Sequence, residues 1–223
     1  MEKKRTIGTG VYLVIDPSMN RSELYDKLDA VLAEGIAALQ IWDHFREGDD
    51  IPKLINELCL RCHAKDVPVL INNLWPYLID TPLDGVHFDA ASRDYKAVQA
   101  AIGRPFLCGI TATNDMTPVW WARDHQADYI SFCSMFPSST ADSCEIVTPA
   151  SVNRAKAIYS GPVFLAGGIR PDNVAELNEL HYAGIAVISG IMSSDTPGKT
   201  IRQYQKNIPY SRQSDYYEDR NHQ

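Results

Sequence analysis

The residues best suited to chemistry in this sequence include two short glycine-containing turns near its end. The first, Ala166–Ile169, follows an apolar run and precedes Arg170-Pro171, and the second, Ser189-Gly190, follows the next apolar run. Paired glycines let backbone N–H groups approach an anion closely, and a helix beginning at Pro171 would add a favourable dipole. The alternative is that these small residues serve only tight turns and close packing. We expect a phosphate site built from Gly167, Gly168, Ser189 and Gly190.

A second candidate site surrounds His87 and Asp89, which alternate along one short apolar run and so could point the same way. Together with Asp43 or His44 they would offer ligands for a divalent metal, with Asp89 as the metal candidate. His44, His87 and Asp89 are also the candidates for carrying a proton. The competing interpretation, which we favour for His87, is a histidine hydrogen-bonded inside the fold.

Cys59 and Cys62 form a C-x-x-C pair, but they lie on the apolar stripe of an amphipathic segment. A zinc site needs a second pair of ligands, and only His63 is close in sequence. We therefore expect these thiols to pack in the core.

Charge and hydropathy exclude several classes of protein. The 223 residues hold 21 Lys and Arg against 28 Asp and Glu, a net charge of −7. Such an acidic surface repels phosphate backbones, and no basic patch offsets it, so no nucleic-acid partner is expected. No apolar segment approaches the roughly 20 residues that span a bilayer, and the first residues lack the apolar stretch of a signal peptide. We expect a reduced, cytoplasmic protein with no membrane partner; a homodimer is compatible with the sequence.

The elements that must position these residues follow a regular alternation. Eight short, almost continuously apolar runs recur at intervals of about 20–30 residues, which is typical of strands covered on both faces. The segments between them have helical periodicity, except that the link from Asn72 to Asp84 is too short for a full helix. The runs are Val11–Ile15, Ala37–Ile41, Pro68–Ile71, Gly85–Phe88, Phe106–Ile110, Tyr129–Phe132, Pro162–Ala166 and Ile185–Ile188. Helices are expected at Arg21–Glu34, Ile51–Lys65, Arg93–Ile102, Met116–His125, Pro149–Tyr159, Pro171–Tyr182 and Thr200–Asn207.

This alternation predicts a parallel α/β protein, either a closed barrel or an open doubly wound sheet. A dinucleotide-binding sheet would carry a glycine-rich turn after its first strand, whereas Asp16–Asn20 contains no glycine. The glycines instead follow the seventh and eighth runs, where eight-stranded barrels often bind phosphate. We predict a single-domain (β/α)8 TIM barrel over residues 1–209, followed by a polar tail over residues 210–223.

Several strand-end motifs, in this order and spacing, resemble the thiamine-phosphate synthase family and its relative, the thiazole tautomerase. The resemblance covers about residues 10–208. It is carried by Val11–Val14, Leu39-Gln40, Ile71-Asn72, Asp84–His87, Gly109–Thr111, Asp128–Ile130, Phe136-Pro137, Ala166–Ile169 and Ala186–Ile191.

The resemblance implies a barrel enzyme that joins a pyrimidine methyl diphosphate to a thiazole phosphate with the help of Mg2+. It also implies that Gln40 and Asn72 bind the aromatic base and that Thr111 lines the pocket. Further substrate-binding positions carried over in this way are Trp42, Asn73, Ser138 and Thr140.

This chain departs from the family pattern mainly on the diphosphate side of the site. Trp42 and His44 stand where the family has an Arg and a Lys. Asn73 and Ser92 stand at its two magnesium-binding Asp positions, and Ala141 replaces a further Lys. Thr113 stands where the tautomerase has its catalytic His. Without these cations a diphosphate leaving group loses several kcal/mol of stabilisation, and Arg46 or Arg170 could restore only part of it.

Two classes of function remain open, with a third behind them. The first is a thiamine-phosphate-synthase-like enzyme that binds a phosphorylated heterocycle, with weak or altered synthase activity. The second is a non-catalytic or regulatory barrel that kept phosphate-ligand binding. The third is a metal-dependent sugar-phosphate epimerase that uses His44, His87 and Asp89. Strand-end lysines are absent from the sequence, which disfavours a Schiff-base aldolase.

Overall fold

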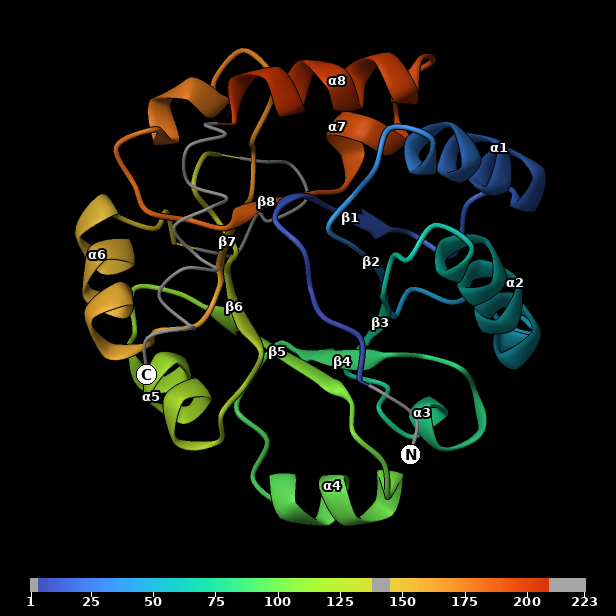
Figure 1. Ribbon diagram of the computed structural model, residues 1–223, viewed down its shortest axis with the longest axis horizontal. Helices are drawn as coiled ribbons and strands as arrows, with labels where there is room; N and C mark the ends of the chain where they lie inside the picture. Colours follow the sequence, from blue (N-terminus) through green and yellow to red (C-terminus); the bar gives the residue numbers. More distant parts are fainter. Residues whose placement is uncertain (1–3, 138–144, 209–223) are drawn as a thin grey trace.

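Eight parallel strands close into a barrel in chain order, and helices surround it (Figure 1). The structure is a computed structural model and describes residues 4–137 and 145–208. The positions Ser138, Thr140 and Ala141 and the expected tail 210–223 lie outside the described residues. The strands are β1 (Gly10–Ile15), β2 (Ala38–Ile41), β3 (Val69–Asn72), β4 (Gly85–Phe88), β5 (Leu107–Ala112), β6 (Tyr129–Phe132), β7 (Val163–Ala166) and β8 (Gly184–Val187). Pairing of Gly10 with Gly184 joins β1 to β8 and closes the barrel, so the predicted (β/α)8 fold is confirmed.

The helices lie on the outside of the barrel; most connect consecutive strands along the chain, and the last two follow β8 (Figure 1). Several begin at a side-chain cap: Asn20, Asp50, Asp94 and Thr148 each accept a backbone N–H of the first turn. The helical elements are α1 (Arg21–Leu32), α2 (Ile51–His63), α3 (Tyr77–Asp80), α4 (Tyr95–Ile102), α5 (Thr117–Asp124), α6 (Pro149–Ile158), η1 (Val174–Leu177), α7 (Ser189–Met192) and α8 (Pro197–Asn207).

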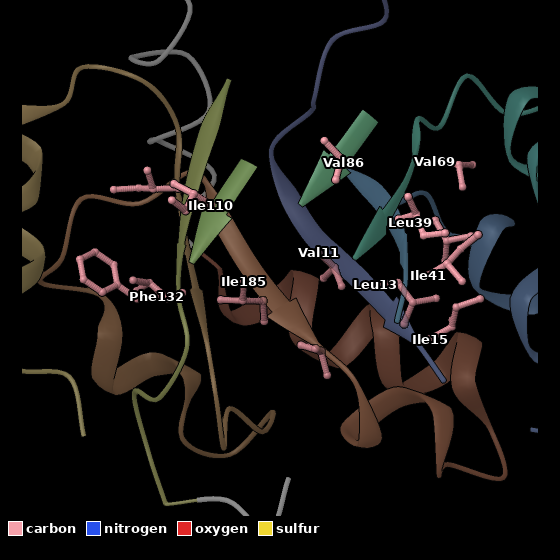
Figure 2. Packing of buried hydrophobic residues seen from close by; sticks show 14 of the residues in the cluster. Val11, Leu13, Ile15, Leu39, Ile41, Val69, Val86, Ile110, Phe132 and Ile185 are labelled. Carbon is pink, nitrogen blue, oxygen red and sulfur yellow. The ribbon is translucent and has the colours of Figure 1, made fainter. Parts of the chain in front are cut away.

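Strand alternation divides the buried side chains into two layers. Val11, Leu13 and Ile15 point outward and pack against the helices, and Figure 2 shows them within this outer core. Tyr12 and Val14 point into the barrel, where they join a smaller apolar cluster. Because one residue step exchanges the two faces, the register of each strand decides which side chains reach the interior.

The expected helix over Pro171–Tyr182 is wrong. Only η1, a four-residue 3-10 helix, forms there. Most backbone bonds here join residues three apart, from Asn173 N–H with the Arg170 carbonyl to Leu180 N–H with the Leu177 carbonyl, and only the Val174 N–H bond to the Arg170 carbonyl spans four. No α-helix therefore begins at Pro171, and the dipole expected behind the glycine turn is missing.

The two cysteines of the C-x-x-C pair lie on α2. Cys59 and Cys62 are both buried in the core on α2, as predicted, and burial raises the pKa of the Cys62 thiol to about 12. Thiols held in this form are poor nucleophiles and metal ligands.

Among the helices in the described ranges, none is long and apolar enough to cross a membrane.

Candidate functional site at the barrel mouth

A polar layer lies inside the barrel just below the carboxyl ends of the strands. Gln40 on β2, Asn72 on β3 and His87 on β4 point inward, and each is less than a tenth exposed. Thr111 on β5 is the only partly exposed residue of its strand, which places it at the upper edge of this layer. The four residues named from the sequence are therefore brought together on neighbouring strands.

Two tyrosines of the apolar runs, which were not among the predicted site residues, complete this layer. The Tyr12 hydroxyl donates to Gln40 Oε1 at 2.8 Å and lies 2.8 Å from the Tyr129 hydroxyl. Gln40 Nε2 donates to Asn72 Oδ1 at 2.9 Å. Both tyrosines are fully buried, so their hydroxyls need these partners. Alternate residues of a strand point into the barrel, so the positions of the two tyrosines on β1 and β6 are the sequence signal that could have found them.

His87 connects the tyrosines to Thr111. Its Nδ1 lies 2.9 Å from the Tyr129 hydroxyl, and its Nε2 lies 2.9 Å from Thr111 Oγ1. Burial lowers the pKa of His87 to about 4, against an opposing effect of Asp89, so the imidazole is neutral near pH 7. Both ring nitrogens are engaged inside the barrel, which matches the interpretation of His87 as a hydrogen-bonded barrel histidine.

Asn73 occupies the centre of a small acidic group at the mouth. Its Nδ2 donates to Asp43 at 3.1 Å and to Asp89 at 2.8 Å, and its Oδ1 accepts the Asp89 N–H at 3.0 Å. Asp89 also accepts a hydrogen bond from Asn72 at 3.1 Å. Asn73 adopts a left-handed backbone (φ 53°), which asparagine tolerates better than most residues.

The two positions at which the resemblance places magnesium-binding Asp residues, Asn73 and Ser92, give the ion no carboxylate in this chain. When bound, Mg2+ neutralises phosphate charge, and it prefers carboxylate oxygens. Asn73 offers a carboxamide whose polar atoms are already used, and Ser92 offers only a hydroxyl. Across 4–137 and 145–208, no three His, Cys, Asp or Glu side chains form a group that could hold a metal, so His44, His87 and Asp89 do not converge on one.

Trp42 and His44 form an aromatic pair at the end of β2. Their rings stack with centroids 3.6 Å apart and planes 25° apart. The His44 side chain is half exposed, and its Nδ1 lies 3.9 Å from Asp16 Oδ2. The pair therefore places two stacked rings beside the mouth, where the resemblance implies two cations.

The first glycine turn is held against the loop that follows β6. Gly167 (φ 90°) and Gly168 (φ 64°) both adopt conformations that favour glycine. A Cβ on Gly168 would lie 2.6 Å from the Pro137 carbonyl oxygen, and one on Gly167 would clash with the Cys133 carbonyl. Close packing therefore requires both glycines, whether or not an anion binds.

The second turn lies beside the first because β7 and β8 are neighbours, with Ala166 paired to Ala186. Ser189 and Gly190 are exposed and begin α7, where the first N–H groups of a helix lack intrahelical acceptors. Tyr204 of α8 lies between the turns: its hydroxyl donates to the Ile169 carbonyl at 2.9 Å, and a Cβ on Gly190 would clash with the same hydroxyl. Backbone donors from two adjacent strands thus share one side of the mouth.

Asn173, which the sequence analysis did not name, fixes the first turn. This buried side chain donates from Nδ2 to the Gly168 carbonyl at 3.0 Å and accepts the Arg170 N–H at 2.7 Å. Arg170 itself is exposed and pairs with Asp172 at 3.0 Å. A polar residue five positions after a glycine turn is too weak a sequence signal to have predicted this role.

Fold and site together define a single-domain (β/α)8 barrel with a buried polar layer and two glycine turns at one end. The thiamine monophosphate synthase family matches residues 11–191. The chain belongs to this family.

Individual relatives support the same assignment. A thiamine-phosphate synthase from Azoarcus sp. strain BH72 is 30% identical over 190 residues, covering 84% of this chain and 91% of that protein. One from Methanobrevibacter smithii is 26% identical over 187 residues, covering 84% and 89%. The solved thiamine phosphate pyrophosphorylase from Pyrococcus furiosus superposes with a TM-score of 0.77 at 18% identity, covering 89% of this chain and 95% of that one.

Proposed function

We propose that this chain binds a phosphorylated aromatic heterocycle of the thiazole phosphate type at the mouth of its barrel. Backbone N–H groups of Gly167, Gly168, Ser189 and Gly190 would hold the phosphate. The observation that carries the proposal is the side-by-side placement of the two turns, pinned by Tyr204 and Asn173. Glycine is also needed there for packing, so the proposal rests on the two neighbouring sets of backbone donors rather than on glycine itself.

The heterocycle would lie above the polar layer. Thr111 is half-buried at its upper edge, whereas Gln40 and Asn72 are buried and bonded to one another. Each of these amides still has one free N–H and one free lone pair in principle, so they can meet a ring without breaking the pair. Ser138 and Thr140 stay candidates from the sequence alone.

We further propose that the synthase reaction is slow in this chain. The stacked pair Trp42 and His44 and the neutral Asn73 supply little charge for a diphosphate leaving group. Removing one preorganised donor from a developing anion typically costs about 10²–10³ in rate. Arg170 is held by Asp172, which supports the view that it does not replace the missing cations.

The test is direct. The purified full chain is incubated with thiazole phosphate, the pyrimidine methyl diphosphate and Mg2+, and thiamine phosphate is assayed beside the Azoarcus relative. We expect a rate lower by at least about 10², the effect of one lost donor. Turnover within tenfold of the relative would show that the charge argument is wrong.

A non-catalytic binding role is the second candidate, favoured by the same neutral and aromatic replacements. A binder would be stabilised by thiazole phosphate without forming product. Ligand at 100 times its dissociation constant adds about 2.7 kcal/mol to the free energy of unfolding, which a thermal-shift assay resolves. Absence of any shift at millimolar ligand would argue against phosphate-ligand binding altogether.

A further inference from the structure

The hydrogen bonds of the polar layer form one continuous chain across the barrel, and the chemistry at one end fixes its direction. Asp89 lies at the mouth, exposed to solvent, and accepts from Asn72 Nδ2 at 3.1 Å and Asn73 Nδ2 at 2.8 Å. An ionised carboxylate has no proton to donate. The Asn72 amide must therefore present its nitrogen to Asp89 and its oxygen to the barrel interior.

That orientation fixes the next two side chains. Because Asn72 Oδ1 faces Gln40, the Gln40 amide presents Nε2 to it, at 2.9 Å. Gln40 Oε1 then faces Tyr12, and only an O–H donor can satisfy it, so the Tyr12 hydroxyl donates at 2.8 Å. Each amide can point only one way as long as Asp89 stays an acceptor.

The two tyrosines transmit this direction across the barrel. A phenol has one proton, and Tyr12 gives its proton to Gln40. The 2.8 Å contact between Tyr12 and Tyr129 must then use the Tyr129 proton. The Tyr129 oxygen is left as an acceptor toward His87 Nδ1, 2.9 Å away.

We infer that Asp89 acts through this chain as a positioning residue that holds His87 in the tautomer protonated on Nδ1. His87 Nε2 is then a bare acceptor, and the Thr111 hydroxyl at 2.9 Å must donate to it. Thr111 consequently offers only oxygen lone pairs to the pocket. A ligand atom that meets Thr111 has to be a hydrogen-bond donor, such as an amino group, a ring N–H or a hydroxyl.

All six bonds of the chain point toward the carboxylate, an arrangement in which each bond polarises the next. The neutral state of the imidazole, whose pKa burial lowers to about 4, is what makes two tautomers distinguishable. The inference concerns only this chain's own groups and does not depend on the proposed ligand.

The ring nitrogens of His87 report the direction. The full-length protein is labelled with 15N-histidine, and long-range proton–nitrogen correlation spectra near pH 7 show which ring nitrogen carries the proton. The spectrum of His87→Gln identifies the His87 signals among the six histidines. In the unaltered protein we expect a proton on Nδ1; a proton on Nε2, or on both nitrogens, would overturn the inference.

Two variants that each remove one hydroxyl test the direction. Thr111→Val removes the donor at the end of the chain farthest from Asp89, so the imidazole proton should stay on Nδ1. Tyr12→Phe removes the acceptor of the Tyr129 proton, which then has only His87 Nδ1 to bind, so the imidazole proton should move to Nε2. A change in the first variant, or no change in a folded second variant, would contradict the chain.

Asp89→Ala tests the origin of the direction at a solvent-exposed position outside the apolar core. Without the carboxylate the two orientations of the amides become comparable, so both tautomers should be populated in the His87 signals. A spectrum with Nδ1 alone protonated would show that Asp89 does not set the tautomer. This variant and Thr111→Val decide the question even if Tyr12→Phe fails to fold.

Discussion

Trp42 and His44 stack ring on ring at the carboxyl end of β2, with centroids 3.6 Å apart. Thiamine monophosphate synthases are the family of this chain, and the sequence resemblance assigns an Arg and a Lys to these two positions. Two cations there would repel one another unless an anion bound between them, whereas two stacked rings attract each other without a ligand. This stacking is the observation behind our proposal that the synthase reaction is slow in this chain.

The glycine turn after β7 should be sensitive to a single methyl group. Gly168→Ala places a Cβ 2.6 Å from the Pro137 carbonyl oxygen in a left-handed backbone, so two penalties add. Gly103→Ala is the matched control: its φ is 67°, but the nearest atom to its Cβ is 3.9 Å away. We expect about 1 kcal/mol lost in the control and at least about 2 kcal/mol in Gly168→Ala, measured by urea unfolding. Equal losses would mean that the turn relaxes freely.

The role of Asn173 predicts a second pair of variants. Asn173→Ala removes the bonds to the Gly168 carbonyl and the Arg170 N–H, which should cost about 1–3 kcal/mol and weaken binding of thiazole phosphate. Asn178→Ala is the control, because its buried Oδ1 has no hydrogen-bond partner within the described residues. The control should be close to neutral in unfolding and unchanged in calorimetric titration. Similar affinities of both variants for thiazole phosphate would show that Asn173 does not contribute to the phosphate site.

The buried imidazole predicts a pH dependence of stability. Burial lowers the pKa of His87 from 6.5 to about 4. Between about pH 4 and pH 6.5, the residue therefore binds a proton in the unfolded chain but not in the folded one. The free energy of unfolding is therefore unaffected by this residue's titration above about pH 6.5. It falls by up to about 3 kcal/mol as the pH drops toward 4. His87→Gln should be less stable at pH 7 but should lose less on acidification. Parallel curves for both proteins, measured by urea unfolding, would contradict a neutral buried His87.

Much of the fold could be predicted from local sequence, because each apolar run of four or five residues is covered on both faces. The runs beginning at Val11 and Gly85 became β1 and β4 almost residue for residue. The helix expected at Pro171 failed because apolar spacing at Val174 and Leu177 fits a 3-10 turn as well as an α-helix. The Asn173 side chain stabilises the observed turn through its bond to the Gly168 carbonyl, a contact that the spacing of apolar residues does not reveal.

The site could be predicted only in part, for a similar reason. Gln40, Asn72, His87 and Thr111 were recognisable as polar residues at strand ends, and the barrel brings them together. Their connection runs through Tyr12 and Tyr129, which are 117 positions apart and meet only when the barrel closes. A tyrosine inside an apolar run looks like core until its inward direction and its partner are known.

We propose that this chain keeps a site for a monophosphate and lacks one for a magnesium diphosphate. Calorimetric titration of the full chain with the pyrimidine methyl diphosphate, with and without Mg2+, tests it most directly. We predict weak binding that Mg2+ does not strengthen, alongside measurable binding of thiazole phosphate under the same conditions. Tight diphosphate binding that requires Mg2+ would contradict the account.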